Sequence, residues 1–256
     1  MSSNTPAFEL CQSFLGNFEG YAEKNCEAFR VASPFPHVVA DNLFDERLID
    51  LILREYPQRD AAIWQRYDDR DIQVKVRTNW KCDADIPANV REVVRTLNSG
   101  RFLLALSKLT GIRNLISDPY LTGGGLSSVY RGGILDLHCD GNWHDAMAVH
   151  RRLNAILYLN PGWQESWGGQ LEFWDRKLER CVKRITPLCN RLVVFVTNDF
   201  TFHGHPQPLN CPEEESRRSL ILYYYTSRPR EADEIAVGDP HRALWRNRGQ
   251  VAASRK

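Results

Sequence analysis

The chain has 256 residues, with 33 basic and 32 acidic side chains and a formal net charge of +1. A chain of this length forms one or two domains and can fold without disulfide bonds or a structural metal. The near-neutral charge disfavours nucleic acid or an anionic membrane as the main partner, because both select a basic excess. The classes of protein that the charge leaves open are small-molecule enzymes, neutral binding modules and protein-binding scaffolds.

The seven cysteines are scattered, with no Cys-x-x-Cys pair, and indicate neither a zinc site nor a disulfide framework. Residues 1–20 lack the basic and apolar regions of a signal peptide. The longest apolar runs, such as Leu192–Val196, are far shorter than the roughly 20 residues that span a bilayer. We therefore expect a reduced, cytoplasmic protein that does not cross a membrane.

Helical periodicity dominates the chain before residue 120. Pro36–Ala40 has the pattern of a strand. Asp45–Tyr56 and Asn89–Leu109 then place apolar residues three and four positions apart, as a helix with one buried face requires. Asp45 is a candidate N-cap for the first of these helices.

After residue 120 the chain becomes a series of short β-type runs separated by Gly, Pro and Asn. Seven such runs indicate a sandwich or a barrel. They are Leu126–Arg131, Ile134–Cys139, Leu153–Leu159, Gln170–Trp174, Cys181–Ile185, Arg191–Val196 and Arg218–Thr226. The segment from Ser227 to Lys256 is polar and is expected to fray. The fold class predicted is α+β with a mainly β core, flanked by N-terminal helices in one compact unit.

The run around His138 carries the first chemical signal. His138 and Asp140 lie two residues apart, so in a strand their side chains share a face, while Cys139 points the other way into the core. An imidazole beside a carboxylate supplies two of the three ligands of a 2-His-1-carboxylate triad, which leaves positions on Fe(II) for a cosubstrate and O2. Alone the pair is a weak signal, because a strand histidine more often makes an ordinary hydrogen bond.

A later histidine could complete the triad. His203 and His205 both follow within a short segment and share a face if it is extended. From the residues alone, either of them could be the third ligand.

Arg217 and Ser219 open the last strand and face the same side. A guanidinium matches a carboxylate at two points, so the pair could anchor a carboxylate inside a barrel. Taken alone, either Arg217 or Arg218 would be interpreted as a solvated charge at the start of a strand. Tyr158 ends an earlier strand and could donate to the anchored carboxylate, or could be an ordinary buried tyrosine.

The order of these features resembles the Fe(II)/2-oxoglutarate-dependent oxygenases of the prolyl 4-hydroxylase-like family. The resemblance covers residues 120–226, with a fainter match at 34–37 and the helix that follows. The features are Tyr130, His138-x-Asp140, Tyr158-Leu159-Asn160, Gly168-Gly169-x-Leu171, His203 and Arg217-x-Ser219. The resemblance implies a single oxygenase domain over 1–256. In it, residues 1–119 form a helical support and substrate lid, residues 120–226 a double-stranded β-helix (jelly roll), and residues 227–256 a tail.

The resemblance also implies roles for single residues. His138, Asp140 and His203 match the iron ligands, and Arg217 matches the residue that binds the C5 carboxylate of 2-oxoglutarate. The residues expected to assist at the cosubstrate are Ser219, Tyr158 and Tyr130. Arg218 would replace Arg217 if the strand register slipped by one. The intact carboxylate of Asp140 argues against halogenation, since halogenating relatives lack it.

The activity that the resemblance implies uses Fe(II), O2 and 2-oxoglutarate, with ascorbate as a helper in vitro, and releases succinate and CO2. The expected substrate is a small metabolite whose C–H bond is hydroxylated or cyclised. Tryptophans and acids in the loops suit a saccharide or an aminoglycoside-like natural product, although they could also be solvated loop residues. The candidate substrate contacts are Trp80, Asn142, Trp143 and Trp167.

Two other hypotheses remain. One is a prolyl-hydroxylase-type enzyme that acts on a protein or peptide. The other is a non-catalytic jelly roll that binds a metal or a sugar, which the Arg217–Ser219 pair disfavours because such a barrel needs no carboxylate anchor. The sequence carries no prediction of oligomeric state.

Overall fold

The computed structural model describes residues 6–80, 82–238 and 240–250. Its helices are α1 (Pro6–Val31), α2 (Glu46–Arg54), α3 (Ala88–Leu97) and α4 (Gly100–Thr110). Its strands are β1 (His37–Asp41), β2 (Trp64–Asp69), β3 (Gln73–Thr78), β4 (Ile116–Ser117), β5 (Gly125–Tyr130), β6 (Leu135–Cys139), β7 (Trp143–His144), β8 (Val149–Tyr158), β9 (Leu171–Trp174), β10 (Cys181–Ile185), β11 (Arg191–Val196), β12 (His203–His205), β13 (Ser216–Thr226) and β14 (Leu244–Trp245). Short 3₁₀ helices are η1 (Asp83–Asp85), η2 (Glu165–Trp167), η3 (Ala232–Glu234) and η4 (Arg246–Arg248).

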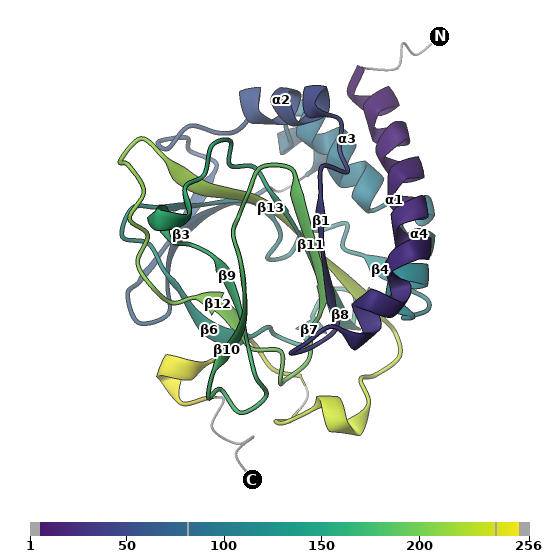
Figure 1. Ribbon diagram of the computed structural model, residues 1–256, viewed down its shortest axis with the longest axis vertical. Coiled ribbons are helices and arrows are strands. Elements are labelled where there is room, and N and C mark those ends of the chain that lie inside the picture. The colour runs from purple at the N-terminus through teal and green to yellow at the C-terminus, as the bar shows by residue number, and fades with distance from the viewer. Residues whose placement is uncertain (1–5, 81, 239, 251–256) are drawn as a thin grey trace.

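The strands form one antiparallel sheet that curls into a jelly roll. Its main order is β1-β11-β8-β13-β5-β3-β6-β12-β9-β10, and β2, β4, β7 and β14 add to its sides. In Figure 1 the helices lie outside the wall made by β1, β11, β8 and β13, while β6, β12, β9 and β10 form the opposite wall. The predicted fold, a mainly β jelly roll with N-terminal helices, is therefore confirmed.

Side-chain alternation gives the helix-covered wall two different faces. In β8, Leu153, Ala155 and Leu157 belong to the large core shared with the helices. Ile156 and Tyr158, which alternate with these residues along the strand, belong to a second cluster between the two walls. Because successive residues of a strand point to opposite faces, each inward position of β8 and β13 is fixed by the burial of its neighbours under the helices.

The helices seal the outer face with aromatic side chains. Phe18 of α1 stacks on Phe102 of α4 with ring centroids 4.6 Å apart, and Phe14 stacks on Phe44 at 3.8 Å. The Asp45 carboxylate accepts a hydrogen bond from the backbone N–H of Arg47 and caps α2, as predicted. None of the described helices is both long enough and apolar enough to cross a membrane.

Three sequence-based expectations need correction. The single helix expected over 89–109 is two helices, because Ser99 caps α4 by accepting a hydrogen bond from the Phe102 N–H at 3.3 Å. The helical support expected over residues 1–119 contains more strands than the one predicted at 36–40, since β3 lies between β5 and β6 in the sheet. The C-terminal segment does not fray over 240–250, because β14 pairs with β6. Residues 251–256 lie outside the described part of the chain.

Candidate metal centre and active site

Three side chains that could bind one metal ion meet where β6 pairs with β12. His138 lies opposite His203 in the antiparallel register, and Asp140 closely follows the end of β6. Nε2 of His138 lies 3.5 Å from Oδ1 of Asp140, and Nε2 of His203 lies 3.6 Å from Oδ2. The potential ligand atoms all lie within 4.8 Å of one another, which fits one ion held by two imidazoles and a carboxylate.

Backbone carbonyls orient both imidazoles for metal binding. Nδ1–H of His138 donates to the Asp136 carbonyl at 2.9 Å, and Nδ1–H of His203 donates to the Thr201 carbonyl at 2.9 Å. The lone pair of each Nε2 is therefore left for a metal. Burial, reinforced by the nearby His138, lowers the pKa of His203 to about 4. His203 is thus neutral near pH 7, as a metal ligand must be.

The carboxylate of Asp140 is held in its ionised form. Nδ2 of Asn154 donates to Oδ2 at 2.5 Å, and Nη1 of Arg151 lies 3.6 Å from Oδ1. Burial raises the pKa of Asp140, but the imidazoles of His203 and His138 and the Arg151 guanidinium outweigh it and hold that pKa well below its usual value. An ionised carboxylate is the form that binds a divalent cation.

Arg217 is a buried cation without an acidic partner among the described residues. It is 6% exposed, and its Nε donates to the Gly169 carbonyl at 2.7 Å while Nη2 donates to the Tyr158 hydroxyl at 2.9 Å. Both partners are neutral, and a buried charge is costly without a counterion. The rest of the guanidinium fork fits an incoming carboxylate.

The surroundings of Arg217 agree with such an anchor. Ser219 lines the same cavity two residues further along β13 and pairs in register with Tyr158. Gly169 has φ +72°, and a side chain there would meet Arg217 Cδ at 3.0 Å, so a glycine permits this approach. Arg218 instead places its Nη2 3.9 Å from Glu215 and does not line the cavity, so the register slip considered from the sequence does not occur.

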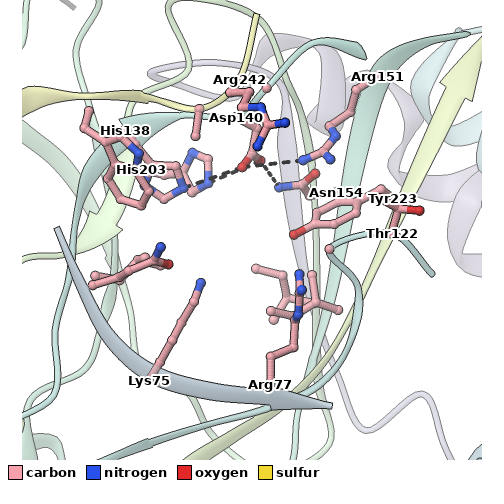
Figure 2. Close-up of a pocket in the computed structure, with 18 of the residues that line it drawn as sticks. Lys75, Arg77, Thr122, His138, Asp140, Arg151, Asn154, His203, Tyr223 and Arg242 are labelled. Carbon is pink, nitrogen blue, oxygen red and sulfur yellow. Dashed lines mark hydrogen bonds and ion pairs between the residues drawn. The ribbon is translucent and has the colours of Figure 1, made fainter. Parts of the chain in front are cut away.

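The triad and Arg217 line one cavity of about 670 Å³. Figure 2 shows His138, His203 and Asp140 on one side of it, with Lys75 and Arg77 rising from β3 on the opposite side. The apolar side chains of Ile156, Leu171 and Ile221 also line the cavity. The cavity therefore joins a metal-binding group, an anion-binding group and an apolar surface.

Several lining residues were not recognised in the sequence. They are Tyr67, Gln73, Lys75, Arg77, Arg151, Asn154, Tyr223, Arg242 and Trp245. A signal for β3 exists in the alternation of Gln73, Lys75 and Arg77 with valines, which is typical of a strand with one polar face. Arg151 and Asn154 lie on β8, and only the inward register of that strand could have identified them.

Five of the expected contacts do not line the cavity, and one of them, Tyr158, is connected to it through its hydrogen bond to Arg217. Tyr130 ends β5 beneath Arg59, whose guanidinium lies 4.5 Å from the ring centroid. Trp80 packs against the helix-side core, and Trp167 packs edge-on against another tryptophan in a separate cluster. Asn142 is buried beneath the C-terminal segment. Of the four expected substrate contacts, only Trp143 lines the cavity.

The C-terminal segment 240–248 forms one edge of the cavity. The Trp245 ring stacks on His138 with centroids 4.5 Å apart, and Trp245 pairs with His138 in the β14–β6 register. Oδ1 of Asn142 accepts from the His241 backbone N–H at 2.8 Å. The Asp199 carboxylate accepts from His241 Nε2 and from Arg230 Nη1, each at 2.9 Å. This segment therefore covers the metal centre.

Comparison with known families identifies the segment that holds these groups. Residues 125–225 match the sequence model of the 2OG-Fe(II) oxygenase superfamily. The matched segment contains the triad, Tyr158, Arg217 and Ser219, whereas β3 and the C-terminal segment lie outside it. The match supports the family resemblance for this segment, and the name of the superfamily gives Fe(II) and 2-oxoglutarate as its metal and cosubstrate.

Individual relatives agree on the fold and differ in substrate. Prolyl 3-hydroxylase OGFOD1 of Mus musculus is 35% identical over 86 residues, which is 32% of this chain and only 15% of that protein. A prolyl hydroxylase from Trichoplax adhaerens in complex with a hypoxia inducible factor peptide is 17% identical, with a TM-score of 0.58 over 82% of this chain and 91% of that one. The non-heme alpha ketoglutarate dependent epimerase SnoN from nogalamycin biosynthesis is 14% identical, with a TM-score of 0.52 over 87% of this chain and 93% of that one.

Proposed function

We propose that this chain, whose residues 125–225 carry a domain of the 2OG-Fe(II) oxygenase superfamily, is an Fe(II)- and 2-oxoglutarate-dependent dioxygenase that oxidises a C–H bond of a small molecule. One observation carries the proposal. The buried His138–Asp140–His203 triad shares a cavity with Arg217, a buried cation without an acidic partner in the described chain. A barrel that only bound a metal or a sugar would not need that cation.

The metal would be held by Nε2 of His138, Nε2 of His203 and the Asp140 carboxylate. Asn154 fixes the carboxylate through its hydrogen bond, and the backbone carbonyls fix the two rings. When bound, Fe(II) with 2-oxoglutarate and O2 supplies the oxidation of the substrate C–H bond, and succinate and CO2 are released. The protein supplies the ligands, the orientation and the enclosure.

The C5 carboxylate of 2-oxoglutarate would be held by Arg217. The Tyr158 hydroxyl accepts from Arg217, so its own O–H is available to donate to the carboxylate. Burial raises the pKa of Tyr158, which keeps that proton in place. Ser219 adds a second hydroxyl on the same face of β13. The Trp245 ring over His138 would limit the access of water to the metal.

Anaerobic titration of the protein with Fe(II) and 2-oxoglutarate tests the proposal. We expect a weak visible charge-transfer band, followed by succinate when O2 and substrate are added, with ascorbate present. Asp140→Ala should abolish metal binding, measured by calorimetry with Mn(II). Arg217→Gln should retain metal binding and lose the band, because only the cosubstrate anchor is removed.

The controls are Asp60→Ala and Arg113→Gln, which remove exposed charges outside the cavity. Both should behave as the wild type. Absence of the band in the wild-type protein would refute the proposal. An unchanged band in Asp140→Ala would show that Asp140 is not a metal ligand.

A prolyl-hydroxylase activity on a protein or peptide is the second candidate. The similarity to OGFOD1 and the fold of the Trichoplax enzyme favour it. Succinate release measured with a panel of proline-containing peptides against a panel of small metabolites separates the two candidates. Turnover with peptides alone would replace the small-molecule proposal.

A further inference from the structure

The strand opposite the metal centre brings two cations into the cavity. Lys75 and Arg77 lie two residues apart on β3, so they point the same way, and Figure 2 shows both extending from the strand toward the triad. Val76 between them is buried on the other face. The direction of both charges is therefore set by the core packing of β3.

These cations have no acidic partner among the described residues. Arg77 Nη2 donates to the Tyr67 hydroxyl at 2.8 Å and to Gln65 Oε1 at 3.2 Å, both neutral acceptors. The Nε–H of Arg77 is buried and has no acceptor. The ammonium of Lys75 lies 5.8 Å from the Tyr67 ring centroid, without a carboxylate. A guanidinium donor left buried and unpaired indicates that an acceptor arrives from outside the protein.

Further cations line the cavity on the side of the triad, where Figure 2 shows Arg151 and Arg242 beside Asp140. The Arg151 guanidinium stacks over the Tyr223 ring at 3.9 Å, and its Nε is also buried without an acceptor. Arg242 lines the rim from the C-terminal segment. Apart from Asp140, Asp145 is the carboxylate residue of this lining. The lining of the cavity therefore carries more positive than negative charge.

The cofactors would not neutralise this charge. The charges of Fe(II) and of the 2-oxoglutarate dianion cancel each other, and Asp140, which lies 3.6 Å from Arg151, offsets one of the five cationic side chains of the lining. The other four cations would then face a single carboxylate, Asp145, so a net positive charge would remain. An aminoglycoside, one of the substrates expected from the sequence, is a polycation and would be repelled from such a site.

Arg77 also lies apart from the cosubstrate anchor. Arg77 pairs with Ser127 in the β3–β5 register, and Ser127 pairs with Ser219 in the β5–β13 register. Arg217 belongs to the neighbouring inward row, two residues earlier on β13. With standard strand spacings, the two arginine backbones are separated by roughly 12 Å. One anion bound at Arg217 therefore leaves Arg77 available for another.

We propose that the substrate carries an oxyanion group, a carboxylate or a phosphate, which Arg77 and Arg151 bind with Lys75 beside them. This inference rests on the proposed function, because it assigns Arg217 to 2-oxoglutarate and the remaining cations to the substrate. It replaces the neutral or cationic ligand expected from the loop sequences. The oxyanion would hold the substrate with its reacting carbon toward the triad across the cavity.

Binding of phenyl phosphate to the anaerobic Fe(II)–2-oxoglutarate complex tests the inference, with phenol as the neutral probe of the same ring. Calorimetry under saturating 2-oxoglutarate gives the affinities, and the visible band reports the cosubstrate. We expect saturable binding of phenyl phosphate with the band retained, and much weaker binding of phenol. Arg77→Gln should lower the affinity for phenyl phosphate by about tenfold to a hundredfold, because a charge-assisted hydrogen bond is lost. Arg113→Gln removes an exposed charge elsewhere and should bind as the wild type does.

The outcomes separate the two proposals. Loss of the band on addition of phenyl phosphate would mean that the probe displaces 2-oxoglutarate from Arg217. Equal affinities of the wild type and Arg77→Gln for phenyl phosphate would mean that β3 does not bind the oxyanion. Either result overturns the oxyanion site. If the band never forms, the proposed function fails, and the same titration of the protein alone still decides whether Arg77 binds an oxyanion. Lys75→Gln is a second variant, should Arg77→Gln fail to fold.

Discussion

Two histidines of β12 lie two residues apart, and only one reaches the metal centre. His203 pairs with His138, and the register then shifts so that His205 pairs with Leu135. Both ring nitrogens of His205 are buried without a partner. Burial and the nearby charges of Arg217 and Lys75 keep the pKa of His205 well below its usual value. The residues alone left both histidines open, and an irregular strand decides between them.

The predictability of the site depends on whether a residue carries its own chemical signature. The His138-x-Asp140 pair and Arg217-x-Ser219 can be recognised because their spacing places two functional groups on one strand face. Lys75 and Arg77 form the same kind of pair. They were missed because a charged strand face is normally solvated, and only the insertion of β3 between β5 and β6 turns it inward.

Lys75 makes the substrate site sensitive to pH. Burial and the charges of Arg77 and Arg217 lower its pKa to about 8, although Asp140 acts in the opposite direction and the Tyr67 ring lies beside it. The ammonium is thus charged at pH 7 and loses its proton as the pH rises through about 8. Phosphate esters are already dianionic there, with a second pKa of about 6. We therefore expect the affinity for phenyl phosphate, measured by calorimetry, to fall between about pH 7 and pH 9.

Lys75→Gln provides the control for this pH profile. Its affinity should be lower at pH 7 and nearly constant over the same range. A wild-type profile that stays flat through pH 9 would show that Lys75 does not contact the bound oxyanion.

At the scale of elements, the strands of the jelly roll could be predicted better than the first helix and the pairing of the C-terminal strand. The seven β-type runs after residue 120 correspond to β5, β6, β8, β9, β10, β11 and β13. Helix α1 was not predicted, although Cys11, Phe14 and Phe18 have helical spacing, and Gly16 and Gly20 weaken that signal. The pairing of β14 with β6 could not be predicted, because a two-residue strand has no period of its own.

The C-terminal segment should detach more readily as the pH rises. Burial lowers the pKa of His241, but its hydrogen bonds to Asp199 and to the Arg242 carbonyl outweigh burial and raise it above the ordinary value. A raised pKa stabilises the docked form below about pH 6.5, and this contribution is lost as the pH passes through the folded-state pKa. Arg230 shares the Asp199 carboxylate and stays charged throughout.

Hydrogen exchange of residues 240–248, corrected for intrinsic rates, measures this detachment. We expect faster opening at about pH 8.5 than at pH 6. His241→Gln keeps a donor for Asp199 and does not titrate, so its opening should not depend on pH. The same pH dependence in His241→Gln would assign the effect to another group. Replacing Asp199 is not a suitable test, because it would leave Arg230 buried and unpaired.

For the whole molecule, the metal and cosubstrate should raise thermal stability in one cooperative step. They bind where β6, β12 and β13 converge, and β3 joins both walls in a single sheet. Ligand at a hundred times its Kd stabilises the folded state by about 2.7 kcal/mol. For a chain of this size, that corresponds to a rise in Tm of roughly 5–10 °C.

Scanning calorimetry with and without Mn(II) and 2-oxoglutarate measures the rise. Asp140→Ala should unfold in one transition and show no rise, while Asp60→Ala should match the wild type. Two separate transitions, or an equal rise in Asp140→Ala, would contradict this prediction.

The hairpin of β2 and β3 has an evolutionary consequence. It carries Lys75 and Arg77 in one continuous stretch of chain, outside the segment 125–225 that bears the metal ligands and the cosubstrate anchor. Mutations that change the two cations leave the oxidising machinery untouched, so selection can retarget the enzyme without rebuilding its chemistry. Transplanting residues 64–78 between homologues should therefore transfer preference for the charge of the substrate, and directed evolution of new specificities should begin in this hairpin.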